Sequence, residues 1–221
     1  MGDHDMTDDE AKGAAGTRAG DASPPARPST GARRNPASAD AIRQAAADIL
    51  AEEGYARFSI EAVARRARAG KPTIYRWWPS KAALLLDVYH RQKHGVVAPD
   101  TGDLVEDLTA FLDSLFRHWR DTPTGPVFRS VIAEAQSEES AAEALGAYME
   151  ERFAHSAQMI ERARQRGEIG AHVDPRLAIE LVVSFAWCRL LTGRLDMETA
   201  ALRAAVCLFV EGWRAAPARP A

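Results

Sequence analysis

The chain has 221 residues, of which 46% are hydrophobic, and its formal net charge at pH 7 is −3. No apolar run reaches the about 20 residues that a membrane-spanning helix needs. Five acidic residues stand among the first ten, unlike the basic start of a signal peptide. We therefore expect a cytoplasmic protein without a membrane partner. Cys188 and Cys207 lie in apolar stretches and are expected to be reduced core residues.

The charge is unevenly distributed along the chain. Residues 33–81 contain 10 basic and 5 acidic side chains, a net charge of +5. Residues 1–32 hold 3 basic and 6 acidic side chains, and residues 82–221 hold 15 and 20. One basic block in an otherwise acidic chain suggests a local surface that binds a polyanion.

The two ends of the chain are expected to lack a fold. Residues 1–35 are rich in Gly, Ala, Ser, Pro and Asp, and their only large apolar side chains are Met1 and Met6. Such a segment buries too little surface to offset its ordering entropy, so we predict a disordered N-terminal tail. Arg33 and Arg34 close this tail beside the first helix, and residues 215–221 are expected to form a flexible C-terminal tail.

Helical spacing of apolar residues begins after the tail. Ser38 or Asp40 can cap a first helix, and Gly54 is expected to end it in the left-handed conformation. Ser59 begins a second helix. Gly70 precedes a short helix over 71–78. Pro79 interrupts the pattern, and Ser80 precedes a longer helix. The expected buried positions of these helices are Ile42, Ala45, Ala46, Ile49, Leu50, Ile60, Val63, Ala64, Ala67, Leu84, Leu85, Val88 and Tyr89.

The remainder also reads as helices, over 103–120, 125–136, 138–167, 175–191 and 196–214. Leu104, Leu108, Phe111, Leu112, Leu115, Phe116 and Trp119 form the apolar side of the first of these. No strand-like alternation of useful length and no internal repeat is present. The predicted fold class is therefore all-α.

The segment 58–81 carries the strongest functional signal. Two short helices meet at a turn near residues 68–70, an arrangement typical of helix-turn-helix proteins, whose second helix enters the DNA major groove. Ile74 and Trp78 are four apart and are expected to face the core, which points Thr73, Tyr75 and Arg76 outward. The alternative is an ordinary helical hairpin with a solvated basic face.

Here the residues resemble the DNA-binding domain of TetR/AcrR-type transcriptional regulators. The resemblance rests on the helix 42–54, on Ser59 with Ile60 and Ala64, on the run Thr73-Ile-Tyr-Arg-Trp-Trp, and on Pro79-Ser-Lys81 before Leu84 and Leu85. It covers residues 36–96. One departure is Arg68, which stands where the family usually has glycine. Either Arg68 accepts a strained turn, or the turn is formed differently, with Gly70.

This resemblance and the motif together define a set of expected DNA contacts. Arg76 is expected to contact guanine bidentately or to pair with a phosphate, whereas Tyr75 and Lys81 are expected to contact the DNA backbone. The full set is Arg33, Arg34, Ser59, Lys71, Pro72, Thr73, Tyr75, Arg76, Trp77 and Lys81.

The resemblance further implies a helical ligand-binding and dimerisation domain over 97–214, and repression that a small molecule releases. The last two helices would pack with their copies across a twofold axis, and two reading helices about one DNA turn (~34 Å) apart would read a palindromic operator. The expected interface residues are Leu177, Leu181, Phe185, Val206, Phe209 and Val210. The alternative is the core of a monomer.

An effector pocket is expected among the helices of residues 103–191. Candidates for its wall are Phe111, Leu115, Trp119, Phe128, Phe153, Met159 and Trp187, each of which could equally be a core residue. Arg189 and Arg194 are candidates to hold an acidic ligand group, or they interact only with the helix dipole.

The sequence thus predicts a sequence-specific DNA-binding transcriptional regulator that needs no cofactor or metal. The alternative is a helical interaction module that never touches DNA. The sequence contains no phosphate-binding glycine loop, no nucleophile elbow and no convincing acid–base set, so we do not expect an enzyme.

Overall fold

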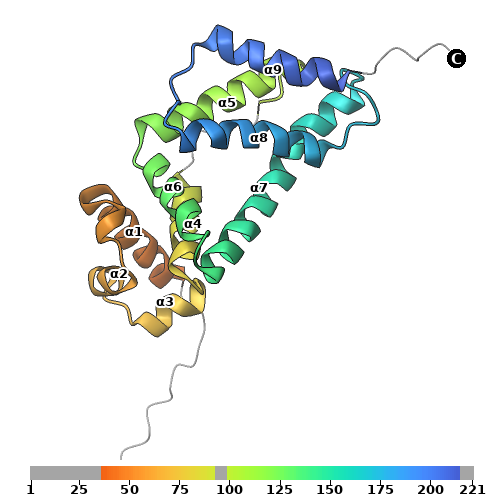
Figure 1. The fold of residues 1–221 in the computed structure, drawn as a ribbon. Coiled ribbons are helices and arrows are strands. Elements are labelled where there is room, and N and C mark those ends of the chain that lie inside the picture. Colours follow the sequence, from red (N-terminus) through yellow and green to blue (C-terminus); the bar gives the residue numbers. More distant parts are fainter. Residues whose placement is uncertain (1–35, 93–98, 215–221) are drawn as a thin grey trace, which may run out of the picture. The chain divides into compact units, whose positions relative to one another are not determined.

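The computed structural model describes residues 36–92 and 99–214, and all structural statements refer to these. Every regular element in them is helical, so the all-α prediction is confirmed (Figure 1). The helices are α1 (Pro36–Glu53), the 3-10 helix η1 (Tyr55–Arg57), α2 (Ile60–Ala67), α3 (Lys71–Trp77), α4 (Lys81–Gln92), α5 (Leu104–Asp121), α6 (Thr124–Glu134), α7 (Glu139–Gln165), α8 (Pro175–Leu191) and α9 (Thr199–Trp213). None of these helices is long and apolar enough to cross a membrane. Arg33, Arg34 and both expected tails lie outside the described residues.

The helix ends differ from expectation mainly at the start of the fold. Helix α1 begins at Pro36, so Ser38 and Asp40 lie inside it and neither caps it. Proline is favoured in the first turn because its missing N–H has no partner there in any case. Gly54 has a φ of 75° but a ψ of 178°, so it does not adopt the expected left-handed helical conformation. The sequence also missed η1.

Helices α1 to α4 share one apolar core. The predicted faces of α1 and α4 are buried, and Ile60 and Val63 bury the inner side of α2, while Ala64 and Ala67 are only half-buried. Helix α1 packs against α2 and α4, and α3 packs against α2 and α1. Helix α4 also packs against α6 and α7, so one helix joins the N-terminal helices to the following ones.

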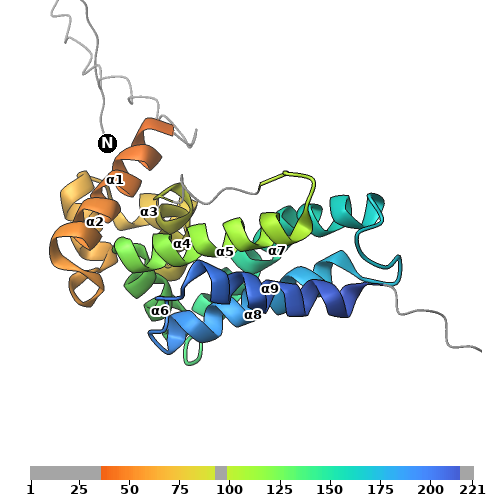
Figure 2. The ribbon, with the colours of Figure 1, turned by 90° about the horizontal axis from the view of Figure 1, so that it is seen from above.

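Helix α5 runs alongside α8 and α9, as the view from above shows (Figure 2). Helix α5 packs against α9 and α8, and α7 packs against α8. All of the apolar positions predicted for α5 are buried. The junction of α5 and α6 needs Gly125, because a Cβ there would lie 2.1 Å from the carbonyl oxygen of Trp119. Across the same junction the rings of Trp119 and Phe128 stack, with centroids 6.0 Å apart.

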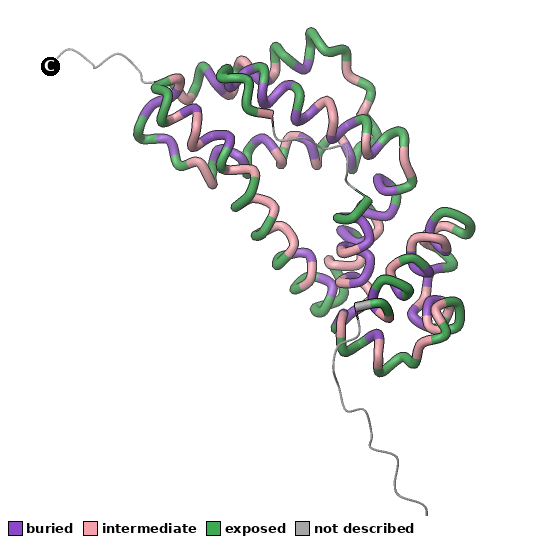
Figure 3. Tube along the Cα trace, turned by 180° about the vertical axis from the view of Figure 1, so that it is seen from behind, coloured by how far each residue is buried: buried purple, intermediate pink, exposed green. Residues whose placement is uncertain are grey.

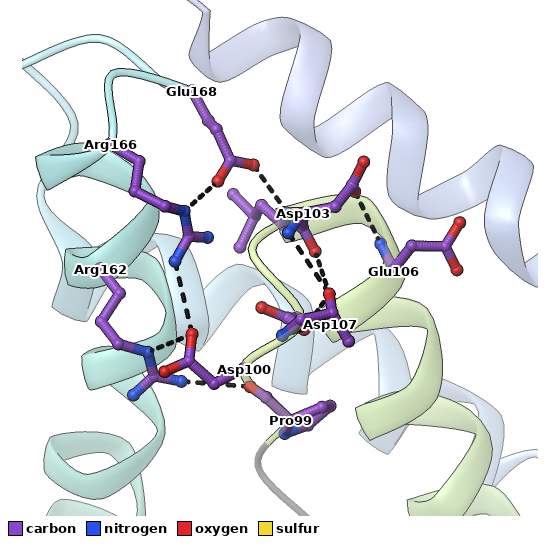
Figure 4. A network of polar contacts seen from close by, with 10 residues as sticks. Pro99, Asp100, Asp103, Glu106, Asp107, Arg162, Arg166 and Glu168 are labelled. Atoms are coloured by element: carbon purple, nitrogen blue, oxygen red, sulfur yellow. Dashed lines mark hydrogen bonds and ion pairs between the residues drawn. The ribbon is translucent and has the colours of Figure 1, made fainter.

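A polar network fixes the entry into α5 against the end of α7 (Figure 4). Asp100 forms an ion pair with Arg162 at 3.1 Å and accepts a hydrogen bond from Arg166 at 3.4 Å. The backbone N–H of Leu104, in the first turn of α5, donates to Glu168 at 2.7 Å. The fully buried Asp107 accepts from the backbone and side chain of Thr101 at 2.8 and 2.7 Å. The sequence analysis did not predict this network, which joins residues about 60 positions apart.

The turn between α2 and α3 has a left-handed residue that is not glycine. Arg68 has φ 51° and ψ 39°, and Ala69 N–H donates to the carbonyl of Ala64 at 3.0 Å, closing the end of α2. Gly70 has a φ of −74°, which any residue adopts. Of the two alternatives for the turn, Arg68 therefore takes the strained position.

We predict that Arg68→Gly stabilises the fold. A left-handed conformation costs a residue with a Cβ about 1–2 kcal/mol, and the greater unfolded-state entropy of glycine returns about half of that. The free energy of unfolding should rise by about 0.5–1 kcal/mol, measured by urea denaturation. Arg68→Ala keeps the strain and is the control. An equal gain in Arg68→Ala would mean that loss of the charge, and not relief of strain, stabilises the variant.

Candidate nucleic-acid interface

Helix α3 buries one side and exposes the other, as the sequence predicted. Ile74 is fully buried and Trp78, the residue after the helix, is 5% exposed. On the opposite side, Tyr75 is 48% exposed and Arg76 is also exposed. Lys71 and Pro72 are exposed at the start of the helix, and Thr73 is half-buried. We call the residues Lys71, Pro72, Thr73, Tyr75 and Arg76 the outer edge of α3.

Two other expected contacts are less accessible than the outer edge. The Ser59 hydroxyl accepts from the backbone N–H of Ala62 at 3.1 Å, so it caps α2 as predicted and is half-buried. Trp77 is half-buried and packs against the core, with its ring centroid 6.1 Å from that of Trp78. Each of these side chains has a structural role in the fold.

A carboxylate of α4 anchors the end of α3. The indole Nε1 of Trp78 donates to Asp87 Oδ2 at 2.8 Å, and Arg43 Nε of α1 donates to the same oxygen at 2.7 Å. The Arg43 guanidinium carbon also lies 5.1 Å from the centroid of the Trp78 ring. We call Asp87, Trp78 and Arg43 the anchor triad. It joins α1, α4 and the residue that follows α3, and sequence periodicity gave no sign of it.

The cations around the outer edge differ in their pairing. Lys71 forms an ion pair with Glu61 of α2, and the hydrogen bond that the Lys71 ammonium donates to Glu61 raises the pKa of that ammonium. Arg66 pairs with Glu52 at 2.7 Å. Within residues 36–92 and 99–214, no ion pair holds Arg76. Of the cationic groups on the outer edge, the Arg76 guanidinium is therefore the most accessible to an external anion.

Lys81, expected at the DNA backbone, is bound to α6. Its ammonium lies 3.0 Å from Glu134 Oε2 and 4.6 Å from the centroid of the Tyr55 ring, and the Tyr55 hydroxyl donates to the same carboxylate. Burial alone would lower the pKa of Lys81, but the hydrogen bonds with Tyr55 and Glu134 outweigh it and raise that pKa. We call Tyr55, Lys81 and Glu134 the α4–α6 latch.

A small cavity of about 30 Å³ lies among helices α4 to α8. Six of the seven expected pocket residues line it, and Met159 does not, because its side chain is buried elsewhere in the core. Arg189 and Arg194 are not among the lining residues either; the basic side chain in the wall is Arg152. The remaining lining residues that the sequence missed are Tyr89, Tyr148, Met149, Ser156 and Val183.

The expected dimer residues divide into exposed and buried ones. Leu177 and Leu181 of α8 are 57% and 48% exposed, and the half-buried rings of Phe185 and Phe209 lie 6.0 Å apart. Val206 and Val210 are buried within the single chain, so they expose no surface to a partner. Figure 3 shows how buried and exposed positions alternate along the helices. The large exposed residues that were missed are Leu191 and Leu208. Cys188 is also exposed on α8, contrary to the expectation of a core residue.

Comparison with known proteins matches both parts of the described fold. The family described as "Bacterial regulatory proteins, tetR family" matches residues 42–88, and "Tetracyclin repressor-like, C-terminal domain" matches residues 98–208. The HTH-type transcriptional regulator YdeS of Bacillus subtilis is 28% identical over 190 residues, which are 85% of this chain and 96% of YdeS.

A second relative and a solved structure agree with this result. The DNA-binding transcriptional repressor TetR of Mycobacteroides abscessus is 32% identical, over 71% of this chain and 84% of that protein. The crystal structure of the TetR family transcription regulator SCO0332 is 31% identical and has a TM-score of 0.70, covering 81% of this chain and 99% of that one. The chain therefore belongs to the TetR family of DNA-binding transcriptional regulators.

Proposed function

We propose that the chain is a repressor that binds a palindromic operator as a homodimer and leaves it when a small molecule enters the cavity. The observation that carries the proposal is the outer edge of α3, where Tyr75 and Arg76 are exposed while Ile74 and Trp78 are buried. Repression follows the relative in Mycobacteroides abscessus, which is named a transcriptional repressor. A regulator of this kind works in the cytoplasm, where the chromosome lies.

The residues of the outer edge take different roles in this proposal. Arg76 reads a base, because its guanidinium has two parallel donors for the O6 and N7 acceptors of guanine. Tyr75 contacts a phosphate through its hydroxyl, which positions the helix without reading sequence. Arg33 and Arg34 remain proposed phosphate contacts that lie outside the described residues.

Dimerisation is supported by the apolar residues on the outside of α8 and α9. Leu177, Leu181, Leu191 and Leu208 are all at least 48% exposed in the single chain. Large exposed apolar groups gathered on two neighbouring helices are typical of a protein–protein interface. Two copies of α3 related by a twofold axis would then meet two half-sites of a palindrome.

The α4–α6 latch links the cavity to DNA binding. Glu134 ends α6, and Phe128 of the same helix lines the cavity. A DNA phosphate and the Glu134 carboxylate compete for the Lys81 ammonium. Each is an anion, and the ammonium must leave the carboxylate in order to pair closely with a phosphate. A ligand that moves α6 changes this competition, and thereby changes affinity for the operator.

The experiment that tests DNA binding uses a duplex from the region upstream of the gene and a scrambled duplex of equal length. The full chain should prefer the upstream duplex, and log K should fall linearly with log salt concentration. Equal, salt-insensitive binding to both duplexes, or no binding to either, would favour the helical interaction module.

We predict that Arg76→Ala changes base preference. Loss of a bidentate contact costs about 1–3 kcal/mol at one base pair and removes discrimination there. Competition binding with operators that carry single base-pair changes measures it, with Arg117→Ala on the exposed side of α5 as the matched control. A uniform loss of affinity for all sequences, with a smaller salt slope, would instead make Arg76 a phosphate contact.

We further predict that Glu134→Gln strengthens operator binding, because it removes the anion that competes for Lys81. Partly exposed ion pairs are worth up to about 1 kcal/mol, so the gain should be at most about fivefold. The matched control is Glu138→Gln, which removes a nearby carboxylate that forms no ion pair with Lys81. The prediction fails if the control gives the same gain, or if the gain persists when Lys81 is replaced by Met.

A further inference from the structure

The cavity among α4 to α8 has a mostly aromatic wall, and its polar side chains can all donate hydrogen bonds. We propose that its ligand is a compact, planar aromatic carboxylate, which the proposed function makes the effector. Only the role of this ligand as the effector rests on the proposed function. The chemistry of the ligand follows from the lining residues, of which the rings determine the shape and the polar groups determine the charge.

The rings form flat, parallel surfaces. The ring of Phe128 stacks on that of Tyr89, with centroids 4.7 Å apart and planes 8° apart, and on that of Trp119 at 6.0 Å and 15°. Trp187 meets Phe128 edge-on at 5.6 Å and 84°. Aromatic rings prefer offset-stacked or edge-to-face contacts, and seven of the twelve side chains that line the cavity are aromatic, so an inserted ring meets ring partners. A planar aromatic body therefore fits the wall better than a branched aliphatic one.

The size of the cavity favours a small ligand. Its volume of about 30 Å³ is far below the about 300 Å³ at which ligand pockets begin. Side chains must move before a ring enters, and the flexible Met149 and the half-buried Phe153 are in position to do so. Such a limited rearrangement makes room for a ligand with one ring or two fused rings.

The polar side chains of the wall include two unsatisfied donors. Arg152 Nε and Tyr148 Oη are both buried, and neither has a hydrogen-bond partner within the described residues. Burial raises the pKa of Tyr148, so its hydroxyl keeps its proton and can donate. Ser156 is the other hydroxyl, and no carboxylate lines the cavity. A carboxylate accepts hydrogen bonds only, and therefore satisfies both donors.

The surface contacts of Arg152 leave its charge available to the cavity. One terminal nitrogen donates to Glu151 at 2.5 Å, and the other lies 3.2 Å from His90 Nδ1. The side chain of Glu151 is 70% exposed, so water screens this pair strongly. The charge of a buried carboxylate beside Nε would be screened far less. A cationic ligand would meet the like charge of Arg152 and have no anion to pair with.

The test compares ligands of one shape and different charge. Benzoate with benzamide, and 1-naphthoate with 1-naphthamide, are titrated by calorimetry into the full chain without DNA. The proposal predicts that at least one carboxylate binds about tenfold or more tightly than its amide, as expected for charge-assisted hydrogen bonds. Equal binding within both pairs, or no binding of either carboxylate at millimolar concentration, overturns it.

Variants assign the preference to the proposed donors. Arg152→Gln should reduce the preference for the carboxylate to about threefold or less while the amide still binds, and Tyr148→Phe should weaken the carboxylate several-fold. Arg129→Gln, at an exposed arginine of α6 outside the wall, is the matched control and should keep the preference. A preference that survives Arg152→Gln contradicts the proposal. The comparison on the unaltered chain decides even if a variant fails to fold.

A second measurement separates this inference from the proposed function. The bound carboxylate is added to the complex with upstream DNA. Release of the DNA supports both the proposed ligand class and the proposed function. A carboxylate that binds through Arg152 but leaves the DNA bound supports the ligand class and contradicts the proposed release. Absence of DNA binding before any ligand is added contradicts the proposed function alone.

Discussion

The carboxylate of Asp87 determines how α3 is presented. Its Oδ2 accepts from Trp78 and from Arg43, at 2.8 and 2.7 Å, and so connects the end of α3 to α1 and α4. Hydrogen bonds to charged groups contribute about 1.5–3 kcal/mol each, and the nearly buried indole N–H would be left unsatisfied without this acceptor. Because α3 has only seven residues, it has little stability of its own and depends on such contacts.

Helix α4 connects this anchor with the rest of the protein. Lys81 lies at its first turn in the α4–α6 latch, Asp87 lies in its middle, and Tyr89 near its end lines the cavity. The next residue, His90, lies beside Arg152. A single helix therefore contacts the residue that follows α3, contacts the end of α6 and lines the cavity. In the proposed function, a ligand in the cavity would therefore act on DNA binding through a small movement of α4 or α6.

Much of the helical fold could be predicted from the sequence because apolar spacing is a local property. The buried sides of α1, α4 and α5, and the opposite faces of Ile74 and Tyr75 on α3, follow from the 3.6-residue period. The outer edge of α3 followed from the same spacing. The anchor triad did not, because residues 43, 78 and 87 are brought together only by packing.

The errors have the same physical origin. Helices α8 and α9 are apolar on nearly all sides, so spacing alone did not distinguish the inner Val206 and Val210 from the outer Leu191 and Leu208. Helix α7 has about as many apolar as polar residues, and nothing local marked Arg152 and Tyr148 as the residues that line the cavity. Arg189 and Arg194 lie near the end of α8 and do not line this cavity. The pairing of Lys81 with Glu134 joins residues 53 positions apart, beyond the reach of any local pattern.

The measurement that tests the role of the anchor most directly is the operator specificity of Asp87→Ala, since Asp87 itself need not touch DNA. Affinities for the upstream and scrambled duplexes are compared at a temperature at which circular dichroism shows the variant to be folded. Asp113→Ala, which removes an exposed carboxylate of α5, is the control. We predict that the ratio of the two affinities falls by about tenfold or more while binding to the scrambled duplex is kept, because phosphate contacts tolerate a misplaced helix and base contacts do not. A folded Asp87→Ala variant with an unchanged ratio would contradict the account.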